Sequence, residues 1–340
     1  MSKILVTGGA GYIGSHTVVE LINAGYTPVM IDNFANAEKG VLQGLKKITQ
    51  HEPVLYEGDC ADKALLREVF SKERITGVIH FAAYKAVGES VQQPLKYYRN
   101  NIDSLLSLLE VMPEFGIQNL VFSSSCTVYG QPDKLPVTET TPKKPAESPY
   151  GNTKQICEEI MQDTITSGVK LKMVALRYFN PIGAHPSAEI GELPLGVPQN
   201  LIPFVTQTAA GIRQQLTVFG DDYDTPDGSC VRDYIHVVDL AVAHVKTISF
   251  LEKQKEDKLF EVFNLGTGRG NTVLEVVKTF EKVSGQPLNY QIGPRRSGDV
   301  VQTYADVSKA RDVLGWQTTR SLEDSLRDAW NWQKKISRIK

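Results

Sequence analysis

The sequence predicts an α/β fold: a doubly wound parallel sheet of the Rossmann type with a smaller, interleaved α/β substrate domain. Three observations predict it. Short apolar strands alternate with helical segments through the first half, a glycine-rich turn follows the first strand, and the alternation breaks after residue 178. Strands that are apolar on both faces are typical of a sheet buried between two helix layers. Their alternation with helices implies parallel pairing through right-handed crossovers.

The individual elements follow from these patterns in chain order. Strands are expected at 4–7, 28–32, 53–57, 78–81, 120–123 and 173–178, with helices near 12–24, 38–49, 62–72, 94–113 and 149–166. The segment 181–234 is rich in Pro, Gly and Asp, and one helix is expected there near 200–211. A strand and a helix return over 234–251, followed by a strand at 262–265 and helices near 272–284, 307–314 and 321–335. We therefore expect a cofactor domain, 1–180 with a return segment at about 234–265, and a substrate domain, 181–233 and 266–340.

Composition argues against several classes of function. The chain has 340 residues, 41% of them hydrophobic, which is enough to form a large core. Its net charge of -2 argues against a nucleic-acid partner. The four cysteines lie far apart and the six histidines show no ligand spacing, so reduced thiols and no metal site are expected. No apolar run approaches the ~20 residues that span a bilayer, and no signal-peptide pattern is present. A cytoplasmic protein without membrane contact is the expectation.

The turn after the first strand has the composition of a dinucleotide-phosphate loop. Gly8, Gly11 and Gly14 are spaced G-x-x-G-x-x-G between a strand and a helix, where a Cβ would obstruct a pyrophosphate at the helix N-terminus. Asp32 ends the next strand, close to the ~20-residue separation expected for an acid that binds ribose hydroxyls. A carboxylate there repels a 2′-phosphate, so NAD is predicted rather than NADP. The plainer alternatives are a glycine turn without a ligand and Asp32 as a strand-end cap.

A tyrosine and a lysine four residues apart supply acid–base chemistry. Tyr150 and Lys154 share one face of the helix expected at 149–166. A free phenol has a pKa near ~10, and a nearby cation favours its ionised form. Tyr150 can then accept the proton of a substrate hydroxyl while a hydride leaves for the cofactor, and Ser125 can hydrogen-bond the reacting hydroxyl. Surface helices also carry such pairs, and Ser125 can be an ordinary strand-end serine, but the glycine loop favours the catalytic interpretation.

Five further segments carry a resemblance that covers nearly the whole chain: 7–16, 80–83, 85–90, 177–181 and 231–237. Through them the sequence resembles the extended short-chain dehydrogenase/reductase family, and within it the members that act at C4 of UDP-hexoses. The resemblance implies NAD-dependent interconversion of UDP-galactose and UDP-glucose, through C4 oxidation, rotation of the ketosugar and re-reduction. It also implies a homodimer. The apolar stripes near 94–113 and 149–166 suit a four-helix interface across a two-fold axis.

The same resemblance implies two sets of site residues. Cofactor contacts are implied for Gly8, Gly11, Tyr12, Ile13, Gly14, Asp32, Asn33, Asn36, Asp59, Cys60, Phe81, Ala82, Lys85, Asn100, Ser123, Tyr150, Lys154 and Tyr178. Substrate contacts are implied for Lys85, Ser125, Tyr150, Phe179, Asn180, Asn200, Leu201, Phe219, Arg232, Arg296, Asp299 and Thr303. Guanidinium groups suit a diphosphate, and an aromatic ring suits uracil. The plainer alternatives are a structural ion pair for Arg232, a core position for Phe219 and a solvated side chain for Lys85.

Thr303 bears on the choice of sugar. Relatives restricted to UDP-glucose and UDP-galactose tend to carry tyrosine at this position, whereas those that also accept N-acetylated sugars carry something small. Since threonine leaves space for an acetamido group, the resemblance implies that UDP-N-acetylgalactosamine and UDP-N-acetylglucosamine are also accepted.

Three other functions remain open from the sequence. A sugar-nucleotide 4,6-dehydratase shares the fold and the Tyr–Lys pair, but it needs an acid and a base just before Val-Tyr-Gly, where this chain has Cys126 and Thr127. A net reductase would consume added NADH. A non-enzymatic dinucleotide sensor would have no use for Tyr150 and Lys154 on one helix face.

Overall fold

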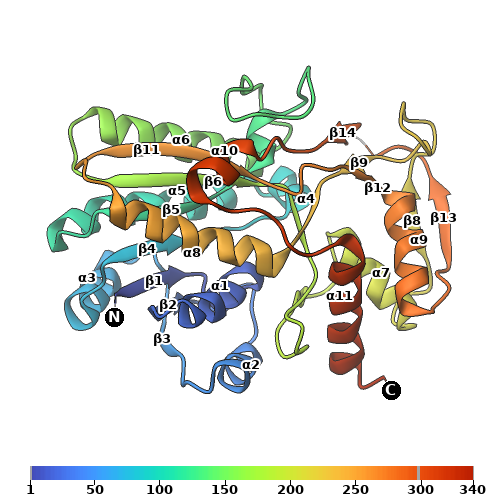
Figure 1. Ribbon diagram of the computed structural model, residues 1–340, viewed down its shortest axis with the longest axis horizontal. Helices are drawn as coiled ribbons and strands as arrows, with labels where there is room; N and C mark the ends of the chain where they lie inside the picture. The colour runs from blue at the N-terminus through green and yellow to red at the C-terminus, as the bar shows by residue number, and fades with distance from the viewer. Residues whose placement is uncertain (1, 297–298, 340) are drawn as a thin grey trace.

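The computed structural model describes residues 2–296 and 299–339, and its centre is a seven-stranded parallel sheet (Figure 1). The strand order is β11-β6-β5-β4-β1-β2-β3, so β1 pairs with β2 on one side and with β4 on the other. The winding direction reverses between these two neighbours, which opens a crevice at the carboxyl end of β1. The predicted doubly wound fold is confirmed.

The sheet and its helices keep the predicted order. The strands are β1 Lys3–Thr7, β2 Thr27–Asp32, β3 Val54–Glu57, β4 Gly77–His80, β5 Asn119–Ser125, β6 Lys172–Tyr178 and β11 Leu259–Leu265. The helices are α1 Tyr12–Asn23, α2 Gly40–Thr49, α3 Lys63–Glu73, α4 Val87–Gln92, α5 Pro94–Val111, α6 Pro149–Thr166 and α8 Val237–Lys253, with 3-10 turns at Met112–Phe115 and Cys126–Tyr129. The short helix α4 was not predicted, because six residues carry too little periodicity to be recognised.

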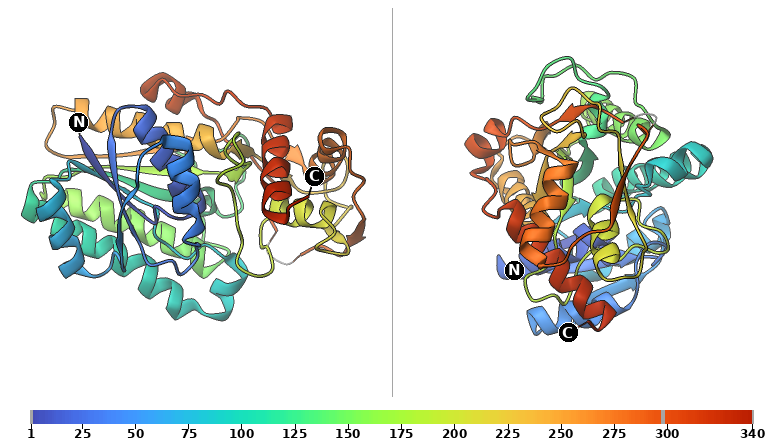
Figure 2. Two further views of the ribbon diagram at one scale, coloured as in Figure 1. Left: turned by 90° about the horizontal axis from the view of Figure 1, so that it is seen from below. Right: turned by 90° about the vertical axis from the view of Figure 1, so that its right-hand side faces the viewer.

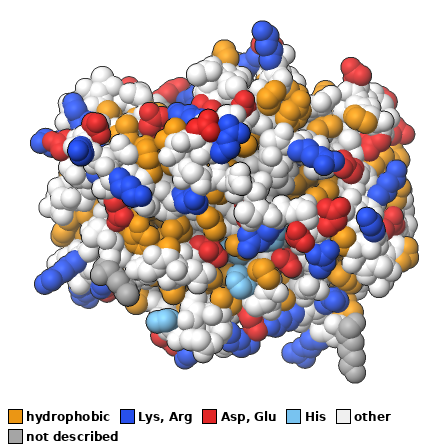
Figure 3. All heavy atoms as spheres, in the orientation of Figure 1, with side chains coloured by type: hydrophobic (Ala, Val, Ile, Leu, Met, Phe, Trp, Pro, Cys, Tyr) orange, Lys and Arg blue, Asp and Glu red, His pale blue; other side chains and the backbone are white. Residues whose placement is uncertain are grey.

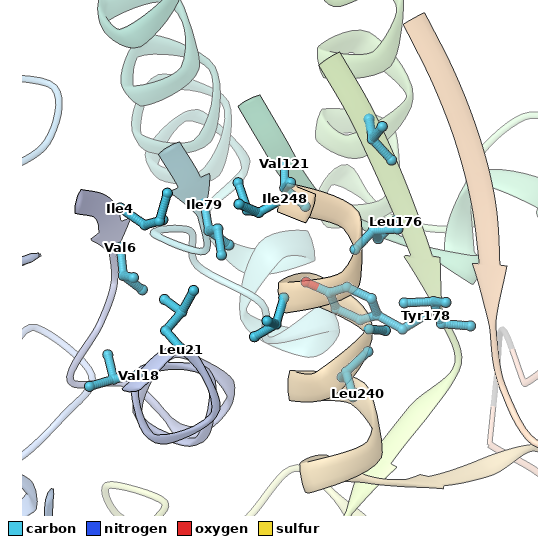
Figure 4. Close-up of a cluster of buried hydrophobic side chains, with 14 of the residues drawn as sticks. Ile4, Val6, Val18, Leu21, Ile79, Val121, Leu176, Tyr178, Leu240 and Ile248 are labelled. Atoms are coloured by element: carbon cyan, nitrogen blue, oxygen red, sulfur yellow. The ribbon is translucent and has the colours of Figure 1, made fainter. Parts of the chain in front are cut away.

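Helices cover both faces of the sheet, and the alternation along β1 shows how. Ile4 and Val6 pack with α1 and α8 on one face, whereas Leu5 packs with α3, α5 and α6 on the other. All three side chains are fully buried, as expected for a strand between two helix layers. Figure 2 shows these layers from two further directions, and Figure 4 shows the first cluster, in which Tyr178 lies beside Leu176 and against α8.

A smaller part lies at the carboxyl end of the sheet, to the right in Figure 1. Its elements are β7 Asn180–Ile182, α7 Leu201–Ala209, β8 Leu216–Phe219, β9 Val231–Arg232, β10 Tyr234–His236, β12 Asn271–Thr272, α9 Val273–Ser284, β13 Tyr290–Gly293, β14 Gln302–Thr303 and α11 Leu322–Ser337. Three helices, α7, α9 and α11, contribute Val205, Phe280 and Trp330 to one core cluster. Of the short strands only β10 was predicted, as the strand before α8; the others were not, since two to four residues give no reliable alternation.

The helix before α11 packs on a different part of the molecule from the one that the predicted domain division assigns to it. The division places 266–340 in the substrate domain, but α10 Ser308–Leu314 packs on the cofactor side. Ala310, Leu314 and Trp316 belong to the same core cluster as Ile4 of β1. The apolar face of α10 is thus covered by α8 and β11, and the chain crosses to the large sheet once more than predicted.

The described residues were compared with what a membrane span and a metal site require. On the face shown in Figure 3, basic and acidic side chains are interspersed. Within residues 2–296 and 299–339, no helix is long and apolar enough to cross a bilayer. Over the same ranges, no three His, Cys, Asp or Glu side chains are grouped so that they could hold a metal ion.

Candidate active site

The glycine-rich turn joins β1 to α1 with almost no spare room. Gly8 has a left-handed backbone, φ +69°, and a Cβ on it would lie 2.9 Å from the backbone nitrogen of Ala82. A Cβ on Gly14 would lie 2.2 Å from the carbonyl oxygen of Gly8. Gly11 is the N-cap of α1 and has no side chain to accept the first N–H groups of the helix. The turn therefore fits a pyrophosphate, which needs a close backbone approach and free N–H donors.

Asp32 ties the end of β2 to this turn. Its Oδ2 accepts a hydrogen bond of 2.9 Å from the backbone N–H of Ala10, and its Oδ1 accepts one of 2.8 Å from that of Phe34. Burial raises the pKa of Asp32, and the backbone N–H groups around it oppose this rise. The carboxylate is held at the edge of the sheet where a dinucleotide's ribose lies, and it disfavours a 2′-phosphate there.

The strand order places the predicted cofactor residues in one row. Parallel strands end at the same edge of a sheet, and β3, β2, β1, β4, β5 and β6 are successive neighbours. Along that edge lie Asp59 and Cys60 after β3, Asp32, Asn33 and Asn36 after β2, Gly8 to Gly14 after β1, Phe81, Ala82 and Lys85 after β4, Ser123 in β5 and Tyr178 in β6. Asn100 joins from α5, where its Nδ2 donates to Asn101. The row connects Asp32, the predicted ribose-binding acid, with the predicted catalytic pair.

Tyr178 provides an independent test of the fit to NAD. The side chain is buried, and its hydroxyl has no hydrogen-bond partner among the described residues. Burial raises the pKa of Tyr178, so the group stays a neutral donor and acceptor. A buried, unpaired hydroxyl is costly unless a ligand satisfies it. Together with the glycine turn at the other end of the row, it fits a cofactor that carries polar groups at both ends.

The catalytic helix α6 begins where its local sequence dictates. The Oγ of Ser148 accepts a hydrogen bond of 3.2 Å from the N–H of Gly151, and Pro149 occupies the first helical position. Tyr150 is consequently in the first turn and Lys154 in the second, on the face toward the sheet. These two side chains reach the carboxyl end of β5 because the start of the helix lies there.

The electrostatics of the pair differ from a simple contact between ammonium and phenol. The Nζ of Lys154 donates a hydrogen bond of 2.6 Å to the carbonyl oxygen of Ser123 and lies 5.9 Å from the centroid of the Tyr150 ring. Burial lowers the pKa of Lys154 to about 8 and raises that of Tyr150 to about 12, and the hydroxyl of Ser125 opposes the second effect. At neutral pH the protein thus holds a charged lysine and a neutral tyrosine that can donate a proton.

Four predicted substrate residues from three segments meet beside β9. Asp299 Oδ1 lies 2.8 Å from an Arg296 guanidinium nitrogen and 3.6 Å from one of Arg232. The guanidinium of Arg296 also lies 5.6 Å from the ring centroid of Phe219. Phe219 is 42% exposed, which rules out the core alternative for this side chain. Two guanidinium groups against one carboxylate leave a net positive charge beside an open aromatic ring, as an anionic nucleotide requires.

A second group contains a residue that the sequence did not indicate. Glu192 Oε1 accepts a hydrogen bond of 2.6 Å from Asn200 Nδ2 and lies 3.2 Å from Lys85 Nζ. Lys85 is exposed, as the solvated-lysine alternative expects, but its Nζ is also held by this ion pair and lies 5.9 Å from the centroid of the Tyr12 ring. Glu192 thereby joins a predicted cofactor residue to a predicted substrate residue. Its segment is irregular and rich in Pro and Gly, and neither periodicity nor spacing marks a partner 107 positions away.

The remaining substrate residues are placed by short strands. Thr303 is half-buried and pairs with Arg232 in the β14–β9 register. The backbone N–H of Asn180 donates to the carbonyl of Asp233 at 2.9 Å. Leu201 opens α7, directly after Asn200. The ring of Phe179 is buried in a core cluster, so this predicted contact does not present its side chain to the site.

Cys126 connects the catalytic pair to the arginine group. Burial raises the pKa of its thiol to about 12, while the charge of Arg232 opposes this rise. The same thiol lies close enough to Tyr150 to act on the pKa of the phenol. The Cys126 thiol therefore lies within electrostatic range of both Tyr150 and Arg232, one residue from each predicted part of the site.

Comparisons with known proteins agree with this geometry. The family model for GDP-mannose 4,6 dehydratase matches residues 5–329. The chain is 51% identical to a UDP-glucose 4-epimerase of Haemophilus influenzae over 97% of both chains. A solved structure of UDP-glucose 4-epimerase from Bifidobacterium longum in complex with NAD+ and UDP superposes with a TM-score of 0.94, at 47% identity and covering 99% and 100% of the two chains. The UDP-Glc/GlcNAc 4-epimerase of Campylobacter jejuni gives a TM-score of 0.84, at 37% identity and covering 98% and 100%.

Proposed function

Because the chain belongs to the UDP-glucose 4-epimerases of the extended short-chain dehydrogenase/reductase family, we propose that it interconverts UDP-glucose and UDP-galactose with NAD as its cofactor. The protein is an isomerase, since substrate and product differ only in configuration at C4. The observation that carries the proposal is the position of Tyr150 and Lys154 at the same sheet edge as the glycine turn, where the Nζ of Lys154 donates to the carbonyl oxygen of Ser123 in β5. The glycine turn and Asp32 would hold NAD, which would supply the hydride acceptor for oxidation at C4 and the hydride donor for re-reduction.

The roles of the chain's own residues follow from their positions. Burial keeps Tyr150 neutral in the protein alone, so it acts as a base only in the ionised form that nearby positive charge favours. In that form it accepts the proton of the C4 hydroxyl during oxidation and returns it during reduction, while Ser125 holds the reacting oxygen. Lys154 stays charged beside them and favours the ionised phenol when the proton moves. Arg232 and Arg296 hold the diphosphate, which leaves the sugar in front of the tyrosine.

The 4,6-dehydratase alternative fails at the end of β5. Elimination of water needs an acid and a base on the two residues before Val128. This chain has Cys126, whose pKa burial raises to about 12, and Thr127, neither of which is a carboxylic acid. A ketosugar formed here has no residue at that position to start elimination.

The deciding experiment uses the purified protein without added cofactor. Incubation with UDP-galactose followed by chromatographic separation should give a mixture of UDP-galactose and UDP-glucose. The amount of NAD released from the protein by denaturation should be smaller than the amount of UDP-glucose formed. The catalytic, rather than stoichiometric, requirement follows because hydride is taken and returned in the same site. Accumulation of NADH together with a free ketosugar would contradict the epimerase activity and indicate a dehydrogenase. Consumption of added NADH would indicate a reductase.

The working form that we propose is a cytoplasmic homodimer. Helices α5 and α6 pack side by side on one face of the sheet. Ile102 and Leu106 on α5 and Ile156 and Ile160 on α6 are only half-buried, and each pair is four residues apart. The outer face of a helix that covers a sheet is ordinarily polar. Two such helices from each subunit can bury these apolar stripes in a four-helix bundle.

We further propose that N-acetylated UDP-hexosamines are accepted. Thr303 is half-buried and lies in register with Arg232, close to where the nucleotide is held. A threonine side chain leaves room that a tyrosine ring would fill. The name of the similar Campylobacter jejuni enzyme, UDP-Glc/GlcNAc 4-epimerase, supports the proposal.

A further inference from the structure

One face of α6 carries a third functional group behind the catalytic pair. Tyr150, Lys154 and Glu158 are spaced four residues apart, so they lie in line along the helix. Lys154 is 3% exposed and Glu158 is 1% exposed. A carboxylate is therefore carried into the interior one turn beyond the catalytic ammonium. A buried carboxylate is unfavourable unless every oxygen is hydrogen-bonded and its charge is paired.

Glu158 meets that requirement by binding two adjacent strands at one level. Its Oε1 accepts hydrogen bonds of 2.6 Å from Ser124 Oγ and 2.9 Å from Arg177 Nε, and its Oε2 accepts one of 2.6 Å from Arg177. Lys143 Nζ lies 2.8 Å from Oε2. In the β5–β6 register, Ser124 pairs with Arg177. One carboxylate thus fastens α6 to both strands at a single step of the sheet.

The fastening reaches a third strand through Arg177. Its other guanidinium nitrogen donates a hydrogen bond of 2.9 Å to the hydroxyl of Tyr129, which in turn donates one of 2.6 Å to Asn264 of β11. Ser124 and Arg177 directly precede two site residues, Ser125 and Tyr178. Movement of α6 against these anchors would displace Tyr150 from Ser125.

We propose that Glu158 is a positioning residue that holds Tyr150 and Lys154 against Ser125 and supplies the negative charge that keeps Lys154 protonated. The proposal rests on the proposed epimerase activity and adds to it a residue outside the predicted catalytic and binding sets. Its two parts are separable, because the bond to Ser124 concerns geometry and the charge concerns protonation.

The charge surrounding Lys154 supports the second part. Several titratable and charged groups surround the pair. They are His80 from β4, Tyr97 from α5, Cys126 from the turn after β5, Arg177 and Tyr178 from β6, Lys143 from the segment before α6, and Cys157 and Glu158 from α6 itself. Burial lowers the pKa of Lys154 to about 8, and Cys157 and Glu158 both oppose this. Since burial also raises the pKa of the Cys157 thiol, Glu158 is the group that carries a negative charge at neutral pH.

The test uses Glu158→Gln, which keeps the size of the side chain and removes its charge. We expect kcat for UDP-galactose to fall by about 10²-fold, which is the loss of rate expected when reacting groups are slightly misplaced, and KM to be nearly unchanged. The alkaline limb of the kcat–pH profile should move to lower pH, because Lys154 loses its proton earlier. An independent readout is the ¹³Cε signal of Lys154, assigned by its loss in Lys154→Met. Its titration midpoint should move below that of the unmodified protein.

Two further variants keep the proposal decidable. Ser124→Ala removes only the bond to β5, so kcat should fall while the titration of Lys154 stays in place. This variant also decides the positioning part if Glu158→Gln does not fold. The matched control is Asp239→Asn, which breaks an ion pair between another buried carboxylate and the partly exposed Arg320. It should lower stability without moving the Lys154 midpoint.

The outcomes separate this inference from the proposed function. A folded Glu158→Gln protein in which either kcat or the Lys154 midpoint is unchanged overturns the proposal, and so does a Ser124→Ala protein with native kcat. If the unmodified protein does not convert UDP-galactose, the proposed function fails. The ¹³C titration then still decides whether Glu158 holds the charge of Lys154.

Discussion

Lys154 is held by the backbone of the neighbouring strand: its Nζ donates a hydrogen bond of 2.6 Å to the carbonyl oxygen of Ser123. The bond joins α6 to β5 two residues before Ser125, at the carboxyl edge of the sheet. The Tyr150 ring centroid lies 5.9 Å from the same nitrogen. The strand end, more than the phenol, sets the position of the ammonium, because a buried charge requires a fixed acceptor.

Replacement of this anchor should damage both chemistry and cofactor retention. In Lys154→Ala we expect turnover of UDP-galactose to fall by at least about 10²-fold, since the cation that favours the ionised phenol is lost. The NAD that copurifies should fall as well, because Lys154 lies in the row of cofactor residues. Chromatography of the nucleotide released by denaturation measures this. Lys170→Ala, which removes an exposed lysine paired with Asp257, is the control, and a full NAD content in Lys154→Ala would contradict the prediction.

The phenol of Tyr150 should be needed for turnover but not for NAD. Tyr150→Phe is expected to lose about 10²–10⁴-fold in kcat, the usual contribution of a positioned acid–base group. The bound NAD should be retained, because the glycine turn and Asp32 are untouched. Tyr26→Phe, which removes a surface hydroxyl bonded to Glu252, should have native activity. A near-native rate in Tyr150→Phe would remove tyrosine from the mechanism.

The sugar range should respond to the volume at Thr303. In Thr303→Tyr we expect turnover of UDP-N-acetylglucosamine to fall at least about tenfold relative to UDP-galactose, as expected when a pocket loses the space for a substituent. Parallel kcat/KM measurements on the two sugars give the ratio, and Thr303→Ser, which keeps the space, serves as the control. An unmodified enzyme that converts UDP-galactose but leaves UDP-N-acetylglucosamine untouched would show that Thr303 is not the gate.

The outer faces of α5 and α6 should form the subunit interface. The unmodified protein is expected to scatter light as a dimer at micromolar concentration. The double variant Leu106→Glu, Ile156→Glu should be monomeric, because it places four carboxylates in an apolar bundle. Val313→Glu changes an exposed valine on α10 and should leave the dimer intact. A monomer mass for the unmodified protein would exclude this interface.

Three buried histidines should make the fold sensitive to mild acid. Burial lowers the pKa of His16 and of His80 to about 3 and that of His244 to about 4. Below an unfolded-state value near ~6.5 the unfolded chain binds protons that the folded chain does not, so stability is fully present above that pH and falls as the pH decreases. Each histidine should remove about 1.4 kcal/mol per pH unit in this range.

Urea denaturation at pH 7 and pH 5.5 measures this dependence above the range where most carboxylates titrate. His244→Gln should reduce the loss by roughly one proton's share, and His51→Gln, at an exposed position, should leave it unchanged. Equal free energies of unfolding for the unmodified protein at the two pH values would contradict the prediction.

The features that could be predicted from the sequence are those that depend on residues close together along the chain. The alternation of strand and helix, the glycine turn and the start of α6 at Pro149 all follow from periodicity, backbone freedom and capping by Ser148. Most of the predicted cofactor residues came from the family resemblance instead, and the strand order then placed them along one edge of the sheet. The identity of the catalytic pair came from its spacing on that helix, in combination with the glycine turn.

The contacts between side chains far apart in the sequence could be identified only from the folded structure. Sheet register brings Ser124 beside Arg177 and lets Glu158 bind both, and the return of the chain brings α10 onto the large sheet. Glu192 likewise reaches Lys85 across 107 positions. Such contacts are set by register, crossover and the packing of irregular segments, whose energies involve many residues at once. Local propensity does not predict these contacts, because the residues next to each partner in the sequence do not indicate which distant side chain it will meet.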